Sequence, residues 1–219
     1  DLMITKDSIQ QQFEQEFPPE RIHAVRALVD LAYESADTLY KYEPNDGMYN
    51  LLRATSVGKG IWADILRAGI ACSARLFCEK GILPYTFETP MNCARNCHHV
   101  RLYNEDVCLY FARTQYNKDI PRKALYRASD LIQTRLFDQE SDINKIKTYA
   151  ATYGDGGEHE FRYGRIGIPG EKNWIHSKPL KVGAYQYPTQ KEKNEILVQL
   201  DENYKALLRR DEKDNGSIK

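Results

Sequence analysis

Hydrophobic residues in the first part of the chain recur at helical spacing in two segments. In residues 19–43 they follow three- and four-residue steps, which predicts a helix with one apolar face. That face comprises Ile22, Val25, Val29, Tyr33, Ala36 and Tyr40. Residues 60–81 repeat the spacing, with a predicted inner face of Ile61, Ile65, Ala68, Cys72 and Leu76, and with Phe77 beside it. Gly81 can end this second helix, because glycine readily adopts the left-handed closing conformation.

The pattern then changes to short runs that are typical of strands. Residues 82–88 predict one strand, and residues 98–114 predict a hairpin that turns at residues 104–106. Residues 145–153 and 160–168 predict two strands joined by a Gly-rich loop, and residues 178–187 are a further candidate. Helices are expected at 90–97, at 121–137 and near the C-terminus, where Thr189 and Glu192 form a capping box.

This order of elements favours a mixed α+β fold. We expect one central sheet of about five or six strands with helices packed on it, preceded by a helical N-terminal part and followed by a C-terminal helix. By residue range, 1–45 would be the helical part that packs on the core, 46–211 the α+β core domain, and 212–219 a frayed tail. Strands on either side of helix 121–137 would form a right-handed crossover if they are parallel.

Charge is unevenly distributed although the whole chain has a net charge of zero. Residues 1–51 hold 4 basic and 10 acidic side chains, whereas residues 52–135 hold 13 basic and 7 acidic ones. Nine of those thirteen are arginine, whose planar guanidinium matches phosphate and carboxylate groups. The asymmetry therefore indicates an anionic partner for the middle segment. The competing interpretation is that the acidic N-terminal part neutralises the basic middle within one fold.

Arginines and tyrosines alternate within residues 95–127, a mixture that suits nucleic acid, because arginine contacts phosphates while aromatic rings stack on bases. The predicted binding residues are Arg95, Arg101, Arg113, Arg122, Lys123, Tyr126 and Arg127. Tyr103, Tyr110 and Tyr116 lie among them in the sequence. A solvated face with internal ion pairs is the alternative for the same residues.

The segment MNCARNCHHV, residues 91–100, is the strongest metal candidate in the sequence. Cys93 and Cys97 would share a helix face, but His98 and His99 would point to opposite sides if they begin a strand. Zinc binding, or activation of one thiol by Arg95 and a histidine, is therefore the minority interpretation, and packing of small cysteines is favoured. We expect no catalytic residue and no cofactor, with zinc or another divalent ion as the exception.

Two glycine-containing segments are weaker candidates. GDGGEHE places Asp155, Glu158, His159 and Glu160 in one loop, which could hold a divalent metal but is more typical of a solvated hairpin loop. SVGKGIW, residues 56–62, has a lysine between glycines but lacks the spacing of a phosphate-binding loop.

Three functions from different classes remain open. The first is a non-catalytic protein that binds nucleic acid or another phosphate-rich ligand through the arginine-rich middle segment. The second is a protein-interaction module of the inhibitor, antitoxin or regulator type. The third is a metal-dependent nuclease, because the element order α-β-β-β-α-β is similar to the restriction-endonuclease-like core. That resemblance implies Asp106 as a first metal ligand, but the strand after it has no acidic–x–Lys triplet.

The cysteine content and the hydropathy of the chain bear on its compartment. The five cysteines are an odd number and lie mostly in apolar surroundings, which favours reduced thiols in a cytoplasmic protein. No run of about eighteen apolar residues is found, so we expect no membrane span.

Overall fold

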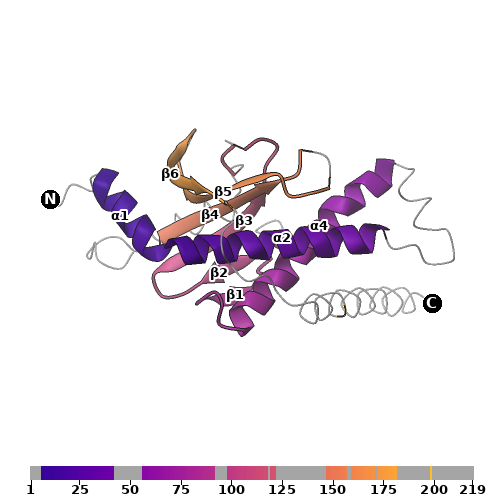
Figure 1. The fold of residues 1–219 in the computed structure, drawn as a ribbon, viewed down its shortest axis with the longest axis horizontal. Helices are drawn as coiled ribbons and strands as arrows, with labels where there is room; N and C mark the ends of the chain where they lie inside the picture. Colours follow the sequence, from indigo (N-terminus) through magenta and orange to yellow (C-terminus); the bar gives the residue numbers. More distant parts are fainter. Residues whose placement is uncertain are drawn as a thin grey trace, which may run out of the picture.

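Six strands form one mixed sheet whose spatial order follows the sequence, β1-β2-β3-β4-β5-β6 (Figure 1). The computed structural model describes residues 6–41, 56–91, 98–117, 119–121, 147–156, 159–170, 172–181 and 198. The strands are β1 Thr86–Glu88, β2 Arg101–Tyr103, β3 Val107–Arg113, β4 Lys147–Gly154, β5 Tyr163–Pro169 and β6 Trp174–Pro179. Neighbouring strands are antiparallel except β3 and β4, which are parallel. The predicted α+β fold with a central sheet is therefore confirmed.

The helices α1 (Lys6–Glu16), α2 (Pro19–Lys41) and α4 (Ser56–Glu79) lie on one face of this sheet (Figure 1). Phe17 of the α1–α2 connection packs its ring edge-on to Tyr149 at 4.9 Å, and Tyr33 of α2 lies 6.3 Å from Tyr153. Tyr149 and Tyr153 are four residues apart on β4, so both project from the same face. The buried core lies between that face and the helices.

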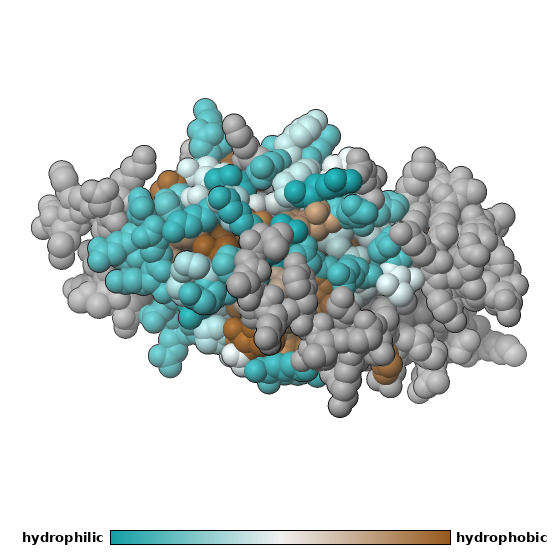
Figure 2. Space-filling view, viewed as in Figure 1, coloured by the Kyte–Doolittle hydropathy of each residue, from teal (hydrophilic) through white to brown (hydrophobic). Residues whose placement is uncertain are grey.

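The predicted inner face of α2 is confirmed at the five positions whose side chains are described. Ile22, Val25, Val29, Tyr33 and Ala36 are all buried. The outward surface of α1 and α2 is mostly hydrophilic, with hydrophobic residues visible only in patches (Figure 2). Helix α2 thus has the one-sided distribution expected of a helix that covers a sheet.

The predicted inner face of α4 is partly wrong. Cys72, Leu76 and Phe77 are buried as expected, but Ala68 is exposed and Ile61 and Ile65 are only partly buried. The buried side chains in this part of α4 lie one or two positions further along, at Trp62, Leu66 and Ile70. Contacts with other elements favour this rotation, because the Trp62 indole packs near Tyr33 and donates a hydrogen bond to Asp155, which directly follows β4.

The backbones of α2 and α4 approach closely at Gly69. A Cβ atom at this position would lie 2.8 Å from the backbone oxygen of Ala32. Glycine is the one residue without a Cβ, so it allows the two helix backbones to come this close. The close contact explains why the buried face of α4 is centred near Gly69 and away from Ala68.

Gly81 closes α4 as predicted. It has a φ of 68°, its amide donates to the carbonyl of Cys78, and the next amide, Ile82, donates to Phe77. These two bonds form a Schellman motif, which satisfies carbonyls that the helix end leaves open.

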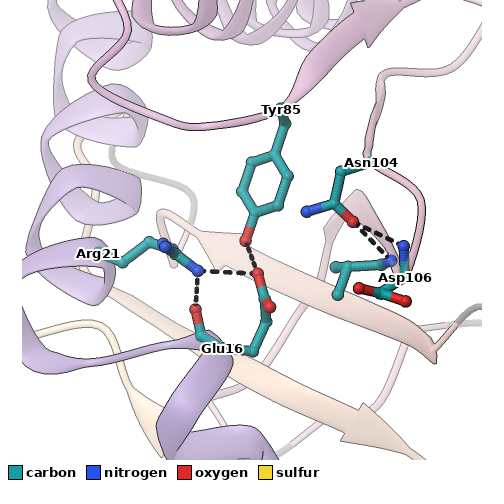
Figure 3. A network of polar contacts seen from close by, with 6 residues as sticks. Glu16, Arg21, Tyr85, Asn104 and Asp106 are labelled. Atoms are coloured by element: carbon teal, nitrogen blue, oxygen red, sulfur yellow. Dashed lines mark hydrogen bonds and ion pairs between the residues drawn. The ribbon is translucent and has the colours of Figure 1, made fainter.

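The predicted hairpin is formed by β2 and β3. At its turn, the side-chain oxygen of Asn104 accepts hydrogen bonds from the amides of Asp106 and Val107 at 3.0 and 2.8 Å (Figure 3). Asparagine favours turns through such bonds. Asp106 is exposed at this turn.

A second polar network joins the start of α2 to the segment before β1 (Figure 3). The Tyr85 hydroxyl donates to Glu16 at 2.6 Å, and Arg21 donates to the same carboxylate oxygen at 2.8 Å. The three side chains are about three-quarters buried or more, so the carboxylate is compensated by both donors.

The remaining strand and helix predictions have mixed outcomes. The last strand, β6, begins at Trp174, earlier than the predicted 178–187, because the turn closed by the Gly170 amide and the Asn173 carbonyl brings the chain back at once. Met91 and His98, which flank the predicted helix 90–97, pair in an antiparallel bridge. Residues 92–97, residues 122–137 of the predicted helix 121–137, residues 182–187 of the predicted last strand, and the predicted C-terminal helix apart from residue 198 lie outside the described residues. No helix within the described ranges is long and apolar enough to cross a bilayer.

The substitution Gly69→Ala should destabilise the protein. The added Cβ collides with the Ala32 backbone, and overpacking of this kind costs about 1–3 kcal/mol. Urea denaturation measures the change. Ala68→Leu, a larger substitution at the exposed neighbour, should leave the unfolding free energy within about 0.5 kcal/mol. A more stable Gly69→Ala protein, as helix propensity alone would give, contradicts the close contact.

Stability should fall between pH 10 and 12. Burial, followed by the charge of Glu16, raises the pKa of Tyr149 from 10 to about 12. Below pH 10 the phenol is protonated in both the folded and the unfolded chain. Above pH 10, the Tyr149 phenol of the unfolded chain loses its proton before that of the folded chain. This difference favours unfolding by about 2–3 kcal/mol once pH 12 is reached. Urea midpoints across this range check the loss, and Tyr149→Phe should reduce it. An unchanged profile in that variant would show that other groups govern alkaline unfolding.

Candidate functional site

The carboxyl ends of the parallel strands β3 and β4 bring Arg113 and Asp155 together. Arg113 ends β3 opposite Tyr153, and Asp155 directly follows β4. In open sheets, ligands commonly bind beyond the carboxyl ends of parallel strands. This edge of the sheet is therefore the first place to search for a site.

The Asp155 carboxylate is held by two donors from different elements. Arg113 Nη2 donates to both of its oxygens, at 3.0 Å to Oδ1 and 2.7 Å to Oδ2, and the Trp62 indole donates to Oδ2 at 3.2 Å. The Asp155 side chain is 5% exposed and that of Arg113 is 37% exposed. The buried carboxylate thus anchors an arginine whose side chain is partly exposed to solvent.

Arg113 remains charged in this setting. Its partial burial lowers the pKa of the guanidinium, but the hydrogen bond and charge of Asp155 outweigh that effect and raise the pKa above its ordinary value. A permanent positive charge therefore lies at the end of β3.

Aromatic rings lie near the Arg113–Asp155 ion pair. The His159 ring stacks on Trp62 with centroids 4.3 Å apart and an interplanar angle of 22°. His159 has a φ of 61°, a conformation that residues other than glycine adopt less often. Tyr33 lies near Trp62, and its burial raises the pKa of its phenol well above the usual range, with a further contribution from Asp155. The Tyr33 hydroxyl has no hydrogen-bond partner among the described residues.

The loop after β3 is tied to the sheet by backbone contacts. The Thr114 amide donates to Tyr153 at 2.9 Å, and the Tyr163 hydroxyl donates to the carbonyl of Gln115. Further on, the Tyr116 amide donates to the Asp119 carboxylate at 2.9 Å, and the Asp119 amide donates to the Tyr116 carbonyl at 3.1 Å. Tyr116 is held in this turn with 63% of its surface exposed.

Two of the seven predicted binding residues fall within the described residues, and they do not share a surface. Arg101 lies opposite Tyr110, three residues before Arg113, which places the two arginines about 10 Å apart along the strands and on opposite faces. Arg101 pairs with Glu88 and lies 5.3 Å over the Tyr103 ring. The other five, which are Arg95, Arg122, Lys123, Tyr126 and Arg127, lie outside the described residues.

Ion pairing is general among the eight arginines of the described ranges. Seven pair with a carboxylate, and Arg165 donates to Ser177. The pairs are Arg21–Glu16, Arg26–Asp30, Arg67–Asp64, Arg75–Glu79, Arg101–Glu88, Arg113–Asp155 and Arg162–Glu160. Arg113 differs from the others in pairing with a carboxylate that is itself almost fully buried.

The metal candidates are brought into no cluster that the structure describes. His98 Nδ1 donates to the Thr89 carbonyl at 2.8 Å, and the His99 ring lies 5.7 Å from that of Tyr110. Cys93, Cys97 and Glu158 lie outside the described residues. Within those residues, no three His, Cys, Asp or Glu side chains are grouped as metal ligands. Cys72, Cys78 and Cys108 are free thiols.

The partnership of Arg113 with Asp155 and Trp62 was not predicted from the sequence. Asp155 was expected to be one of several polar residues in the loop, whereas its carboxylate is buried and Glu160 stays exposed beside Arg162. One available signal was an acidic residue directly after an apolar strand, at a connection that would be a right-handed crossover if its strands were parallel. The nuclease resemblance gains no support at Asp106, which belongs to the exposed β2–β3 turn, at the opposite end of β3 from Arg113.

Comparison with known proteins gives no match to this chain among protein-family models, curated proteins or solved structures. The functional interpretation therefore depends on the site itself.

Asp155→Asn should destabilise the protein by about 2–3 kcal/mol, because removing one charge of a pair leaves the partly buried guanidinium without its counter-ion. Chemical denaturation measures this loss. Asp64→Asn is the matched control, since the Asp64–Arg67 pair is more than half exposed and such pairs contribute about 0–1 kcal/mol. If both variants lose the same free energy of unfolding, the buried Arg113–Asp155 pair stabilises the protein no more than an exposed pair does.

Proposed function

We propose that this protein is a non-catalytic binding protein for nucleic acid or another phosphate-rich ligand, and that Arg113 is its central contact. The site comprises the carboxyl ends of β3 and β4 and the loop that follows β3. The sequence predicts a binding surface of several arginines, and the proposal places the main contact at one of them, Arg113.

The supporting observation is the way in which Arg113 is held. Nη2 makes both hydrogen bonds to Asp155, and Nε and Nη1 are the remaining donors of a side chain that is 37% exposed. Arginine recognises phosphate through pairs of such donors, and a side chain already ordered by a buried carboxylate loses less freedom on binding. Arg113 is therefore prepared to bind an anion on its exposed side.

The local sequence supports the same ligand. The described loop after β3 leads directly into the segment that carries Arg122, Lys123 and Arg127. Residues 52–135 as a whole carry six more basic than acidic side chains, so the surrounding charge favours a polyanion.

A protein partner is the second candidate, and one observation favours it. Strand β6 is at an edge of the described sheet and carries Ile175, which is 47% exposed. An edge strand can pair with a strand of another chain. Replacing Arg113, the exposed charged residue at the end of β3, would leave this mode of binding unchanged.

Arg113→Gln should weaken binding to a fluorescent mixed-sequence oligonucleotide about 10- to 100-fold, measured by anisotropy at low salt. The range corresponds to the loss of a charged hydrogen-bond donor, about 1.5–3 kcal/mol. Arg67→Gln is the matched control, because it removes the same charge from an exposed residue of α4 and should change the affinity less than twofold.

The double variant Arg113→Gln/Asp155→Asn guards against a folding effect, because it replaces the ion pair with two neutral amides. It should fold and still bind weakly. If the wild-type protein binds no oligonucleotide at low salt, the proposal is wrong. It is also wrong if Arg113→Gln and the control Arg67→Gln lose affinity equally.

A further inference from the structure

We infer that the site prefers single-stranded nucleic acid, with one base stacked on the ring of Tyr116. This inference depends on the proposed function, since it assigns the class of ligand that Arg113 would hold. It starts from an aromatic side chain for which the fold provides no cover.

Tyr116 is exposed although its backbone is well anchored. It is the most exposed of the large hydrophobic side chains in the described ranges, at 63%. The paired bonds between Tyr116 and Asp119, and the hold of Tyr163 on Gln115, fix the loop on both sides of the ring. An aromatic ring presented on an ordered loop loses little entropy when it binds a flat partner.

The phenol group is also oriented. The side-chain amide of Gln115 donates to the Tyr116 hydroxyl at 3.3 Å, so the polar end of the ring is engaged within the loop. The two flat faces of the ring are the part of this side chain suited to an incoming base.

Arg113 ends β3 and Tyr116 follows it by three residues in the loop, so a phosphate contact and a stacking surface would be separated by only three positions of the chain. Alternation of these two contacts is typical of proteins that follow a single strand. In a duplex the bases already stack on each other, so their faces are not available to Tyr116. The same arginine would bind duplex phosphates, but without the contribution of the ring.

The test compares three fluorescent probes with the full chain at low salt: a single-stranded oligonucleotide, an abasic strand of the same length and charge, and the matching duplex. The wild-type protein should bind the intact strand at least about fivefold more tightly than the abasic strand, because stacking contributes about 1–3 kcal/mol per base. The duplex should bind no better than the abasic strand.

Tyr116→Ala should remove the preference for the intact strand, whereas Tyr116→Phe should keep it. Both changes are at an exposed position, so thermal melts of the two variants should match the wild-type protein. If intact and abasic strands bind equally, and Arg113→Gln weakens both, stacking on Tyr116 is wrong while the proposed function stands. If no probe binds, both are wrong, and tighter binding of the duplex overturns the single-strand preference alone.

Discussion

The buried carboxylate of Asp155 is the interaction on which this end of the molecule depends. It receives hydrogen bonds from Arg113 at the end of β3 and from Trp62 of α4, so one side chain of the β4 end joins three elements. A buried charge without such donors would be strongly unfavourable. The requirement to satisfy Asp155 therefore specifies how α4 is rotated on the sheet and where the β3 end lies.

The same requirement changes how the positive charge of the middle segment is understood. Most described arginines serve pairs within the fold, as the interpretation with internal ion pairs expected, and Arg101 is one of them. Arg113 combines both interpretations, because an internal carboxylate orients it while part of the side chain remains open to solvent. An ion pair that holds an arginine in place can thus prepare it for a ligand.

Local patterns in the sequence predicted much of the fold but little of the site. The periodicity of α2, the glycine end of α4 and the turn at Asn104 are encoded by neighbouring residues, and all three are confirmed. The rotation of α4 depends on contact with Ala32 and Asp155, which are far away in sequence. Arg113 and Asp155 are 42 residues apart, and their meeting requires the parallel pairing of β3 and β4, which no spacing in the sequence specifies.

That parallel pairing also has a consequence for the order of assembly. The hairpin of β2 and β3 can form from nearby residues, but β4 can join it only after the long connection has been synthesised. Phe13 and Phe17 pack on Tyr149 of β4, so the first helices emerge from the ribosome well before the surface they cover exists. Until β4 is present, the apolar sides of these helices lack part of the surface that they cover in the folded chain.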